Sequence, residues 1–529
     1  MEQVTVIAKD EFFIQSERSV LAVLQENGIA IPASCSGRGR CGKCRIIVTD
    51  GDAPITAEDR KAFRQEELDE GYRLACLLVP SAGVTIRIPE STRRAEEQYH
   101  AVDAFAGNGE KDIEGDTGGF EGTGAAVDIG TTTLAFAKVD LATGAVRKSV
   151  SAMNPQRQHG ADVLSRIAAA DGLGGKMQEE ILTALAQGLE RLYRSEERPE
   201  RIAVAGNTVM LHLLRGYDVS ELGRIPFRPV TLEEENLTAG ELFGAYLPAW
   251  LPKEIPVCLL PGISAFVGAD ITAGLYACDF FTRKDRAFLL DLGTNGEMAL
   301  LSDGVLYTAS AAAGPAFEGG NISCGIGSVE GAVSDVRLYR DADGAMVSKT
   351  TAIGNQKPAG LCGTGLISLI SELKREEAMD ETGLLNEEYF ESGFPFAGEG
   401  NETLYLTQKD IRELQLAKGA IRAGISILLA RAGLRADEVD KVYLAGGFGF
   451  YLDTGAAIGI CLLPSVWSGR ITAAGNSCIG GLVRYLTAKN GEFEALFNRE
   501  QIQEINLAEQ PDFYDKYTEA MAFEEEMLD

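Results

Sequence analysis

The sequence has little positive charge, little histidine and no long apolar run. Its 529 residues include 49 Lys and Arg against 78 Asp and Glu, a formal net charge of −29 with the three histidines neutral. This excess of acid argues against nucleic acid as a partner, because phosphate binding requires a basic face. No apolar stretch reaches the roughly 18 residues that a membrane span needs, so we expect no membrane partner either.

The first residues also lack the features of an export signal. The start MEQVTVIAKDEF has neither a basic n-region nor an apolar h-region, so we expect a cytoplasmic protein. Without export, the ten cysteines are not expected to form a disulfide framework. They are left as free thiols, metal ligands or catalytic residues.

Composition divides the chain into three parts. Residues 1–94 are nearly neutral and are expected to form a small domain. Residues 95–123 combine eight acidic residues with six glycines and a single lysine, so we predict a flexible acidic linker. Residues 124–529 alternate predicted strands with predicted helices, which indicates an α/β architecture.

Hydrophobic periodicity and capping residues predict the main elements. The first part is expected to contain strands at Val4–Ala8, Arg45–Thr49 and Thr85–Ile88 and a helix at Val20–Gln25 with Ser19 as its N-cap. The last part is expected to open with a strand at Ala125–Asp128 and to include helices at Met177–Tyr193 and Ile411–Ala432, the second with Thr407 as its N-cap.

Four cysteines in the first part have the spacing of iron–sulfur ligands. Cys35, Cys41, Cys44 and Cys76 stand as C-x5-C-x2-C-x31-C, and the first three lie in CSGRGRCGKC. An iron–sulfur cluster needs four thiolates, and the glycines let backbone N–H groups point toward its sulfurs. A structural zinc site and free thiols are the alternatives, although zinc usually uses two C-x2–4-C pairs. The other six cysteines show no such pairing and are expected to be small buried hydrophobes.

This cysteine pattern resembles the 2Fe-2S ferredoxins of the vertebrate and bacterial type. The resemblance covers residues 1–94 and implies a β-grasp fold in which the four cysteines hold the cluster. The loop carries Arg38, Arg40, Lys43 and Arg45. This basic rim either steers an acidic redox partner or compensates the charge of the cluster.

Two similar segments of the last part each join an apolar strand to an Asp-x-Gly-Thr turn. AAVDIGTTTLAFAKVDLATG at 125–144 is similar to AFLLDLGTNGEMALLSDG at 287–304, which suggests one duplicated domain. Such turns present N–H and hydroxyl groups to phosphate oxygens, and a carboxylate at the strand end can hold Mg²⁺ through water. A late strand ends in Gly446-Gly447, and the chain has no Gly-x4-Gly-Lys-Ser/Thr motif, so it is not a P-loop protein.

These features resemble the sugar kinase/Hsp70/actin superfamily, in which two duplicated α/β lobes close over ATP. The resemblance implies that the two turns hold the phosphates and that the late Gly-Gly turn lies against the adenosine. It implies Asp128 and Asp291 as catalytic carboxylates and, as ATP-binding residues, Gly130, Thr131, Thr132, Gly293, Thr294, Asn295, Gly446 and Gly447. Asp270 is a further acidic candidate or a helix N-terminal charge, and Glu318 either orients the attacking water or belongs to a turn.

An N-terminal 2Fe-2S module, an acidic linker and such an ATPase together resemble the reductive activators of corrinoid-dependent enzymes. Five further stretches share this resemblance: NPQRQHGADVLSRI, AGNTVMLHLL, AAAGPAFEGGNISCGIG, GLCGTGLISLI and LAGGFGFYLD. The resemblance implies an ATP-dependent activase that passes one electron from the cluster to the Co(II) corrinoid of a methyltransferase corrinoid protein and restores Co(I). That corrinoid protein and a low-potential electron donor are the implied partners. Longer members carry an extra middle domain, which we expect to be absent because the first ATPase strand starts by Ala125.

Three other functions stay open from the sequence. Cys362 in GLCGTG faintly resembles the activators of 2-hydroxyacyl-CoA dehydratases, which hold a 4Fe-4S cluster between subunits but lack a ferredoxin module. A redox-regulated, actin- or chaperone-like ATP-binding protein would use its cluster only as a sensor. A small-molecule kinase ranks last, because no catalytic base beside a substrate pocket can be identified. The oligomeric state is open, a homodimer included.

Overall fold

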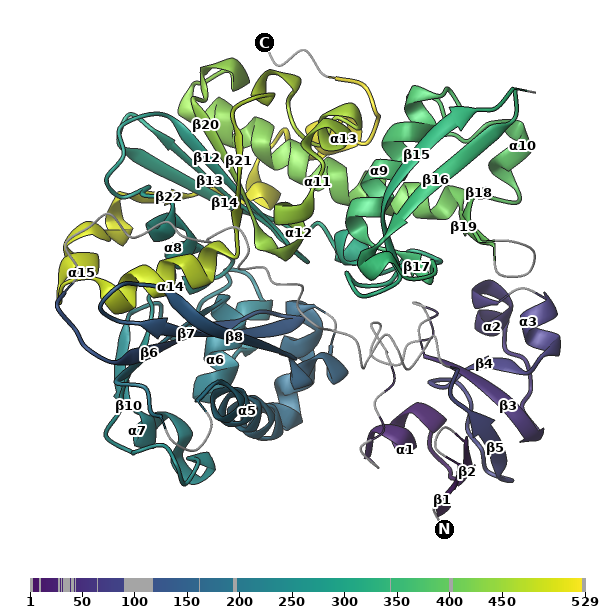
Figure 1. Ribbon diagram of the computed structural model, residues 1–529, viewed down its shortest axis with the longest axis horizontal. Coiled ribbons are helices and arrows are strands. Elements are labelled where there is room, and N and C mark those ends of the chain that lie inside the picture. The colour runs from purple at the N-terminus through teal and green to yellow at the C-terminus, as the bar shows by residue number, and fades with distance from the viewer. Residues whose placement is uncertain are drawn as a thin grey trace.

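The computed structural model describes residues 3–8, 11–26, 29, 31, 39, 42, 44–63, 65–89, 118–160, 162–193, 197–342, 344–398 and 403–525. These residues form an N-terminal module, two α/β lobes and a subdomain attached to the second lobe (Figure 1). Of the predicted linker, residues 95–117 lie outside the described residues. The following Gly118 donates its N–H to the Thr487 carbonyl oxygen at 2.9 Å, so the end of this segment is held on the lobes.

The N-terminal module is a five-stranded sheet in the order β1-β2-β5-β3-β4, with each neighbouring pair antiparallel. Its elements are β1 (Gln3–Ala8), β2 (Glu11–Gln15), α1 (Val20–Glu26), β3 (Arg45–Gly51), α2 (Ala57–Ala62), α3 (Gln65–Asp69), β4 (Tyr72–Leu74) and β5 (Val84–Arg87). The predicted cap of α1 is confirmed, because the Ala22 N–H donates to Ser19 Oγ at 3.3 Å. Buried Val20 and Leu24 place the apolar face of α1 in the module's core.

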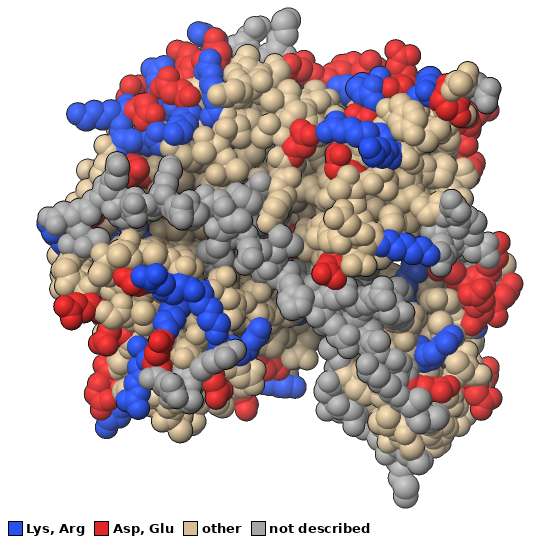
Figure 2. Space-filling view, in the orientation of Figure 1, with Lys and Arg blue, Asp and Glu red and all other residues tan. Residues whose placement is uncertain are grey.

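The surface of this module is acidic along its two short helices. Figure 2 shows acidic side chains gathered over α2 and α3, where Glu66, Asp69 and Glu70 are exposed. Elsewhere on the visible face, acidic and basic side chains alternate over both lobes.

The first lobe is built on a six-stranded sheet in the order β10-β11-β9-β6-β7-β8. Its elements are β6 (Thr123–Ile129), β7 (Thr133–Asp140), β8 (Val146–Met153), α5 (Val163–Tyr193), β9 (Arg201–Gly206), α6 (Thr208–Arg215), β10 (Glu235–Thr238), α7 (Ala239–Phe243) and β11 (Pro256–Leu259). Helix α5 is longer than predicted. It starts fourteen residues before Met177 and is broken at Asp171 and Gly172, where Gly172 has φ +95°. This break explains why periodicity detected only its second half.

The second lobe repeats this plan with the order β21-β20-β12-β13-β14-β22. Its elements are β12 (Ala287–Leu292), β13 (Gly296–Ser302), β14 (Val305–Ala311), α11 (Gln408–Ala432), β20 (Lys441–Ala445), α12 (Gly446–Tyr451), α13 (Thr454–Gly459), β21 (Ile471–Gly475), α15 (Glu492–Leu496), β22 (Ile502–Glu504) and α16 (Phe513–Glu519). Thr407 caps α11 through a reciprocal capping box with Asp410, as predicted.

The predicted duplication is confirmed by matching strand pairs. In the first lobe, β6 pairs antiparallel with β7 and parallel with β9, which sets Asp128 beside Ala205. In the second lobe, β12 pairs antiparallel with β13 and parallel with β20, which sets Asp291 beside Ala445. Each aspartate therefore occupies the same position, at the carboxyl end of the first strand of its lobe.

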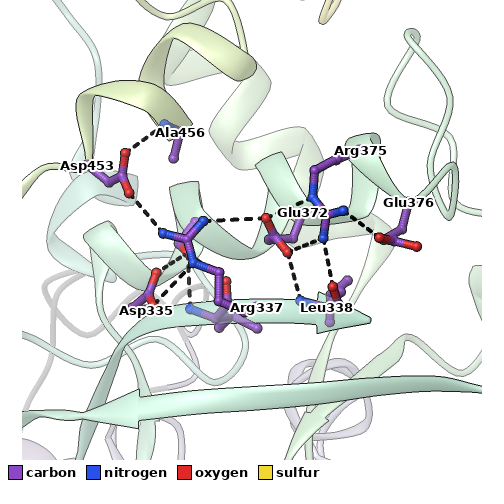
Figure 3. Close-up of polar contacts among 10 residues, drawn as sticks. Asp335, Arg337, Leu338, Glu372, Arg375, Glu376, Asp453 and Ala456 are labelled. Carbon is purple, nitrogen blue, oxygen red and sulfur yellow. Dashed lines mark hydrogen bonds and ion pairs between the residues drawn. The ribbon is translucent and has the colours of Figure 1, made fainter. Parts of the chain in front are cut away.

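A subdomain follows β14 and contains β15 (Ala332–Arg340), β16 (Met346–Ala352), β17 (Gly360–Leu361), α9 (Gly363–Arg375), α10 (Glu387–Phe390), β18 (Phe394–Ala397) and β19 (Leu404–Leu406). Figure 3 shows the ion-pair network that joins it to the second lobe: Arg337 of β15 donates to Asp453 at 3.1 Å. Buried Glu372 of α9 accepts from the Leu338 N–H at 2.7 Å and from Arg375 at 2.6 Å. Because Asp453 also caps α13, the network fixes the subdomain beside the segment that follows Gly446.

Two helices connect the lobes and pack against each other at backbone distance. Helix α8 (Ala269–Ala277) lies between β11 and β12, and α14 (Ser477–Thr487) follows β21 but packs on β6 and β9 of the first lobe (Figure 1). A Cβ on Gly481 would overlap the Ala273 carbonyl oxygen, and one on Gly274 would lie 2.6 Å from Ser477 Oγ. The two helices that connect the lobes are thus in contact at positions where only glycine fits. Within the described part of the chain, no helix has the length and apolar composition needed to cross a bilayer.

This packing predicts that Gly481→Ala destabilises the protein by about 1–3 kcal/mol, because the added methyl group meets backbone that cannot rotate away. Thermal unfolding of the full chain measures the effect. Gly174→Ala in α5 is the matched control, since a Cβ there meets nothing within 4 Å. The control should be neutral or stabilising by about 0.5–1 kcal/mol. Equal melting of Gly481→Ala and wild type would contradict a backbone-limited contact between α8 and α14.

Candidate functional site

Two of the four predicted cluster ligands lie side by side in the N-terminal module, and the other two, Cys35 and Cys41, lie outside the described residues. Cys44 precedes β3 and Cys76 follows β4, and both are buried. The Ala75 N–H donates to the Cys44 carbonyl oxygen at 2.8 Å, which joins the two segments directly. The fold therefore brings the two cysteine segments together although 31 residues separate Cys44 from Cys76 in the sequence.

The loop before Cys44 is shaped by two glycines in the left-handed region. Gly39 has φ +69° and Gly42 has φ +68°. A Cβ on Gly39 would lie 2.9 Å from Cδ1 of Leu77, the neighbour of Cys76, so Gly39 lies against the second ligand segment. Such turns orient backbone N–H groups inward, as an anionic cluster requires. This cradle and its thiol donors fit a 2Fe-2S cluster.

The predicted basic rim of this loop is only partly described. Arg38, Arg40 and Lys43 lie outside the described residues. Arg45 donates to the Gly42 carbonyl oxygen at 3.2 Å and pairs with Glu67 at 3.1 Å. Its charge is therefore balanced within the module.

The first Asp-x-Gly-Thr turn closes tightly at the end of β6. The Gly130 N–H donates to the Thr133 carbonyl oxygen at 3.0 Å, and a Cβ on Gly130 would lie 2.6 Å from that oxygen. Thr131 Oγ1 accepts a hydrogen bond of 3.1 Å from Asn207, the residue that caps α6. The turn is thus fixed by its own backbone and by the start of the next helix.

Arg166 supports the same turn, although sequence reasoning did not identify it as a site residue. Its guanidinium is fully buried and donates to the Gly160 carbonyl oxygen at 3.0 Å and to the carbonyl oxygen of Thr131. Burial lowers the pKa of Arg166 to about 10, so it stays charged at neutral pH. It lies in the stretch NPQRQHGADVLSRI, but neither spacing nor periodicity marks it as a site residue.

The second turn adjoins the late Gly-Gly segment. The Gly293 N–H donates to the Asn295 carbonyl oxygen at 2.9 Å, and the Asn295 side chain bonds to Glu297. Gly446 opens α12 with φ +86°, and a Cβ there would lie 2.7 Å from Asp291 Oδ1. Gly447 follows it in α12. The predicted residues of this half of the site therefore converge.

Glu318 joins the two turns across the lobes. Thr132 Oγ1 donates to its Oε2 at 3.1 Å, and Thr294 Oγ1 donates to its Oε1 at 2.9 Å. The sequence left two roles open for Glu318, either orienting the attacking water or belonging to a turn. The structure places its carboxylate between the two predicted phosphate loops.

Four more carboxylates lie close enough to one another in this region for their charges to interact. Asp128, Asp270, Asp291 and Glu297 are partly exposed, yet protein surrounds them closely. Desolvation, with the charge of Asp128, raises the pKa values of Asp270 and Asp291 to about 7. Desolvation also raises the pKa of Asp128, although Asn476 donates to its Oδ2 at 2.9 Å and opposes that rise. Asp270 is therefore a member of this acidic group and not only a helix N-terminal charge.

Such a group can attract a divalent cation without caging it. Among the described residues, no three His, Cys, Asp or Glu side chains are arranged to hold a metal ion. Mg²⁺ keeps several of its waters and usually takes one or two carboxylates together with substrate phosphates. A cation of this kind at the acidic group would be held mainly through water and substrate oxygens.

The ferredoxin module and the two lobes each match a model of a known protein family. A model of the 2Fe-2S iron–sulfur cluster binding domain matches residues 5–81, a model of the RACo middle region matches 123–283, and a model of the C-terminal ASKHA domain of RACo matches 285–529. The corrinoid activation enzyme RamQ of Eubacterium limosum is 30% identical over 425 residues, which cover 74% of this chain and 69% of that protein. The chain belongs to the family of reductive activators of corrinoid-dependent enzymes.

Two further similar proteins support the family assignment. A reductase of the Co(II) methylated amine-specific corrinoid protein from Methanosarcina barkeri is 28% identical over 403 residues, covering 70% of this chain and 71% of that protein. The solved structure of a reductive activator for a corrinoid, iron-sulfur protein is 26% identical, covers 96% of each chain and has a TM-score of 0.67. The predicted fold class, a ferredoxin-like module followed by a two-lobed ATPase fold, is confirmed for this family member.

One expectation drawn from the family is wrong as stated. The extra middle domain was expected to be absent, but the model of the RACo middle region matches residues 123–283. Those residues are the first lobe with β6 at its start. An apolar strand at Ala125 is therefore compatible with the presence of that region.

The cysteines outside the ferredoxin loop that are described in the structure are mostly buried, as expected. Cys362 is 1% exposed at the start of α9, where its Sγ lies 3.2 Å from the Val333 carbonyl oxygen. A cluster shared between subunits needs accessible thiols. The burial of Cys362 therefore gives no support to the dehydratase-activator alternative.

The contact between Gly446 and Asp291 predicts that Gly446→Ala weakens ATP binding by about 10- to 100-fold, as loss of outer-sphere support does at a cation site. Both the positive φ and the 2.7 Å approach to Asp291 Oδ1 oppose a side chain here. Calorimetric titration with ATP and Mg²⁺ measures the change. Gly433→Ala is the control, because Gly433 has φ +66° but nothing within 4 Å. Equal ATP affinities of the two variants would show that backbone strain alone matters.

The raised pKa values predict a pH-dependent stability. Between the usual aspartate value of 3.8 and about 7, folded Asp270 holds a proton that the unfolded chain has lost. Stability therefore falls as the pH rises through this window. We expect Asp270→Asn, without Mg²⁺, to be more stable than wild type by about 1–3 kcal/mol at pH 8, with the difference shrinking toward pH 4.

Thermal unfolding across this pH range checks the expectation. Asp515→Asn removes an exposed charge and serves as the control. A stabilisation of Asp270→Asn that is the same at pH 8 and pH 4 would show that Asp270 does not titrate in the acidic group.

Proposed function

We propose that this protein passes one electron from a 2Fe-2S cluster to the Co(II) corrinoid of a methyltransferase corrinoid protein, and that ATP hydrolysis drives the transfer. The observation that carries the proposal is the meeting of two Asp-x-Gly-Thr turns across a cleft in a chain that also has the ferredoxin module. The relatives named as a corrinoid activation enzyme and a Co(II) corrinoid protein reductase support the acceptor.

In this proposal, both turns bind the phosphates of ATP. Backbone N–H groups at Gly130 and Gly293 and the hydroxyls of Thr131, Thr132 and Thr294 are the donors, with Asn295 completing the second turn. Gly446 and Gly447 leave room for the adenosine. Asp128 and Asp291 hold Mg²⁺ through its waters, and the buried charge of Arg166 favours the phosphates from behind the first turn.

Cys35, Cys41, Cys44 and Cys76 would hold the cluster, which supplies single electrons at low potential when bound. The transfer to Co(II) is uphill from ordinary donors. For one electron a gap of roughly 100–200 mV costs about 2.5–5 kcal/mol. Coupling between two binding sites is typically about 1–3 kcal/mol, so differential binding of ATP and of the corrinoid protein can supply much of that energy.

Helix α14 is the proposed route of this coupling. At its start, Asn476 donates to Asp128 in the cleft. At its end, the Thr487 carbonyl oxygen accepts from Gly118, where the linker of the ferredoxin module meets the lobes. Phe120 of the same segment lies against the Arg201 guanidinium at 4.8 Å. A shift of Asp128 on nucleotide binding would therefore move the helix that anchors the linker.

The decisive experiment is anaerobic and combines the reduced protein, ATP, Mg²⁺ and a Co(II) corrinoid protein. We expect Co(I) to form in wild type, followed by its visible absorbance, and ATP turnover to depend on the corrinoid protein. Asp128→Asn should slow both rates by about 10- to 100-fold, because it weakens the hold on Mg²⁺. Its cluster absorbance should not change.

Cys76→Ser is the complementary control: it should lose the cluster and Co(I) formation but still bind ATP. ATP turnover that is equally fast without the corrinoid protein would contradict the coupling. Co(I) formation by the cluster-free variant would contradict the electron route.

A further inference from the structure

The hydroxyl donors of both phosphate loops already bind a carboxylate of the protein itself. Glu318 accepts from Thr132 of the first lobe at 3.1 Å and from Thr294 of the second lobe at 2.9 Å, one hydrogen bond to each oxygen. Hydroxyl groups of serine and threonine have a single proton to donate. Neither hydroxyl can therefore donate to a phosphate oxygen while it donates to Glu318.

The backbone that carries Glu318 is fixed on both sides. A Cβ on Gly319 would overlap the Ile326 carbonyl oxygen, and one on Gly320 would lie 2.5 Å from Cβ of Pro315. The neighbouring Phe317 is buried and packs on Phe448 of α12 with ring centroids 5.2 Å apart. Because this turn cannot withdraw, the bridge opens only by rotation of the Glu318 side chain or by separation of the lobes.

The charge around Glu318 suits an anion that can be exchanged. Arg166 and Arg157 act on its carboxylate from the side of the first turn, and burial of the site raises the pKa of Glu318. A polyphosphate entering this position meets the same donors and the same arginines, with more negative charge than a single carboxylate carries. Two anions cannot share one pair of donors without strong repulsion.

We propose that Glu318 occupies the place of the terminal phosphate and ties the lobes together until a triphosphate displaces it. Glu318 is then a positioning residue that sets the affinity for ATP and gives the nucleotide a lever on the lobe contact. The inference rests on the proposed function, in which the two turns bind ATP. It predicts a penalty for nucleotides that reach both hydroxyls and none for a nucleoside monophosphate that does not.

The test compares Glu318→Gln with wild type in the full chain loaded with its cluster. Glutamine keeps the size of the side chain but removes the competing charge. Calorimetry with Mg²⁺ and a non-hydrolysable ATP analogue should show binding about tenfold tighter in the variant. Binding of AMP should be unchanged. Glu330→Gln, an exposed carboxylate of the same subdomain, controls for the loss of one charge and should bind the analogue as wild type does.

Steady-state ATP turnover gives a second measurement that a purely structural role would not change selectively. The Michaelis constant for ATP should fall in Glu318→Gln in proportion to the tighter binding. Glu318→Ala removes the bridge completely and should bind the analogue at least as tightly as is expected for Glu318→Gln. It takes the place of the glutamine variant in the test if that variant folds poorly.

The results that would overturn the role of Glu318 can be told apart from those that would refute the proposed function. Unchanged or weaker binding of the analogue in both variants, with wild type still binding ATP, would overturn the displacement of Glu318 and leave the proposed function standing. A lower kcat with unchanged affinity would assign Glu318 to the hydrolysis step and also overturn it. Absence of nucleotide binding in wild type and every variant would refute the proposed function and this inference with it.

Discussion

The contact between α8 and α14 positions two carboxylates of the acidic group, Asp270 and Asp128. Gly481 meets the Ala273 carbonyl oxygen with no room for a side chain, so the two helices cannot slide without losing the fit. Helix α8 carries Asp270, and α14 starts at Asn476, which holds Asp128. A glycine contact far from any predicted loop therefore sets the spacing of carboxylates that come from both lobes.

This arrangement keeps like charges together at a cost that a ligand can remove. The pKa values of Asp270 and Asp291 reach about 7 because burial and the charge of Asp128 both oppose ionisation. A divalent cation bound among these carboxylates would replace repulsion with attraction, and any ligand of the folded state stabilises it. Glu318 adds a link between the lobes, because it accepts one hydrogen bond from Thr132 of the first lobe and one from Thr294 of the second.

The sequence was informative wherever the chemistry is local. The turns after Asp128 and Asp291 could be predicted because strand, aspartate and Gly-Thr follow one another directly, and the cap at Thr407 depends only on Asp410 three residues later. Arg166 and Asn476 could not be predicted. Arg166 reaches Thr131 from 35 residues away and Asn476 reaches Asp128 from 348, so only the packed fold defines their partners. Glu318 is intermediate between these cases. Its glycine-rich turn could be recognised in the sequence, but its position between the two lobes could not.

The same packing explains how a chain with ten cysteines can direct iron to one place. Metal ligation needs a thiolate, and burial in apolar surroundings opposes that charge. Burial raises the pKa values of Cys258, Cys278 and Cys478 in the lobes, and the carboxylate of Asp128 adds to the rise at Cys478. Cys258, Cys278 and Cys478 therefore favour the protonated form, which is a poor metal ligand. Cys44 and Cys76 of the ferredoxin module are buried as well, but the left-handed Gly39 and Gly42 precede Cys44, and turns of this kind can direct N–H groups at anionic sulfur.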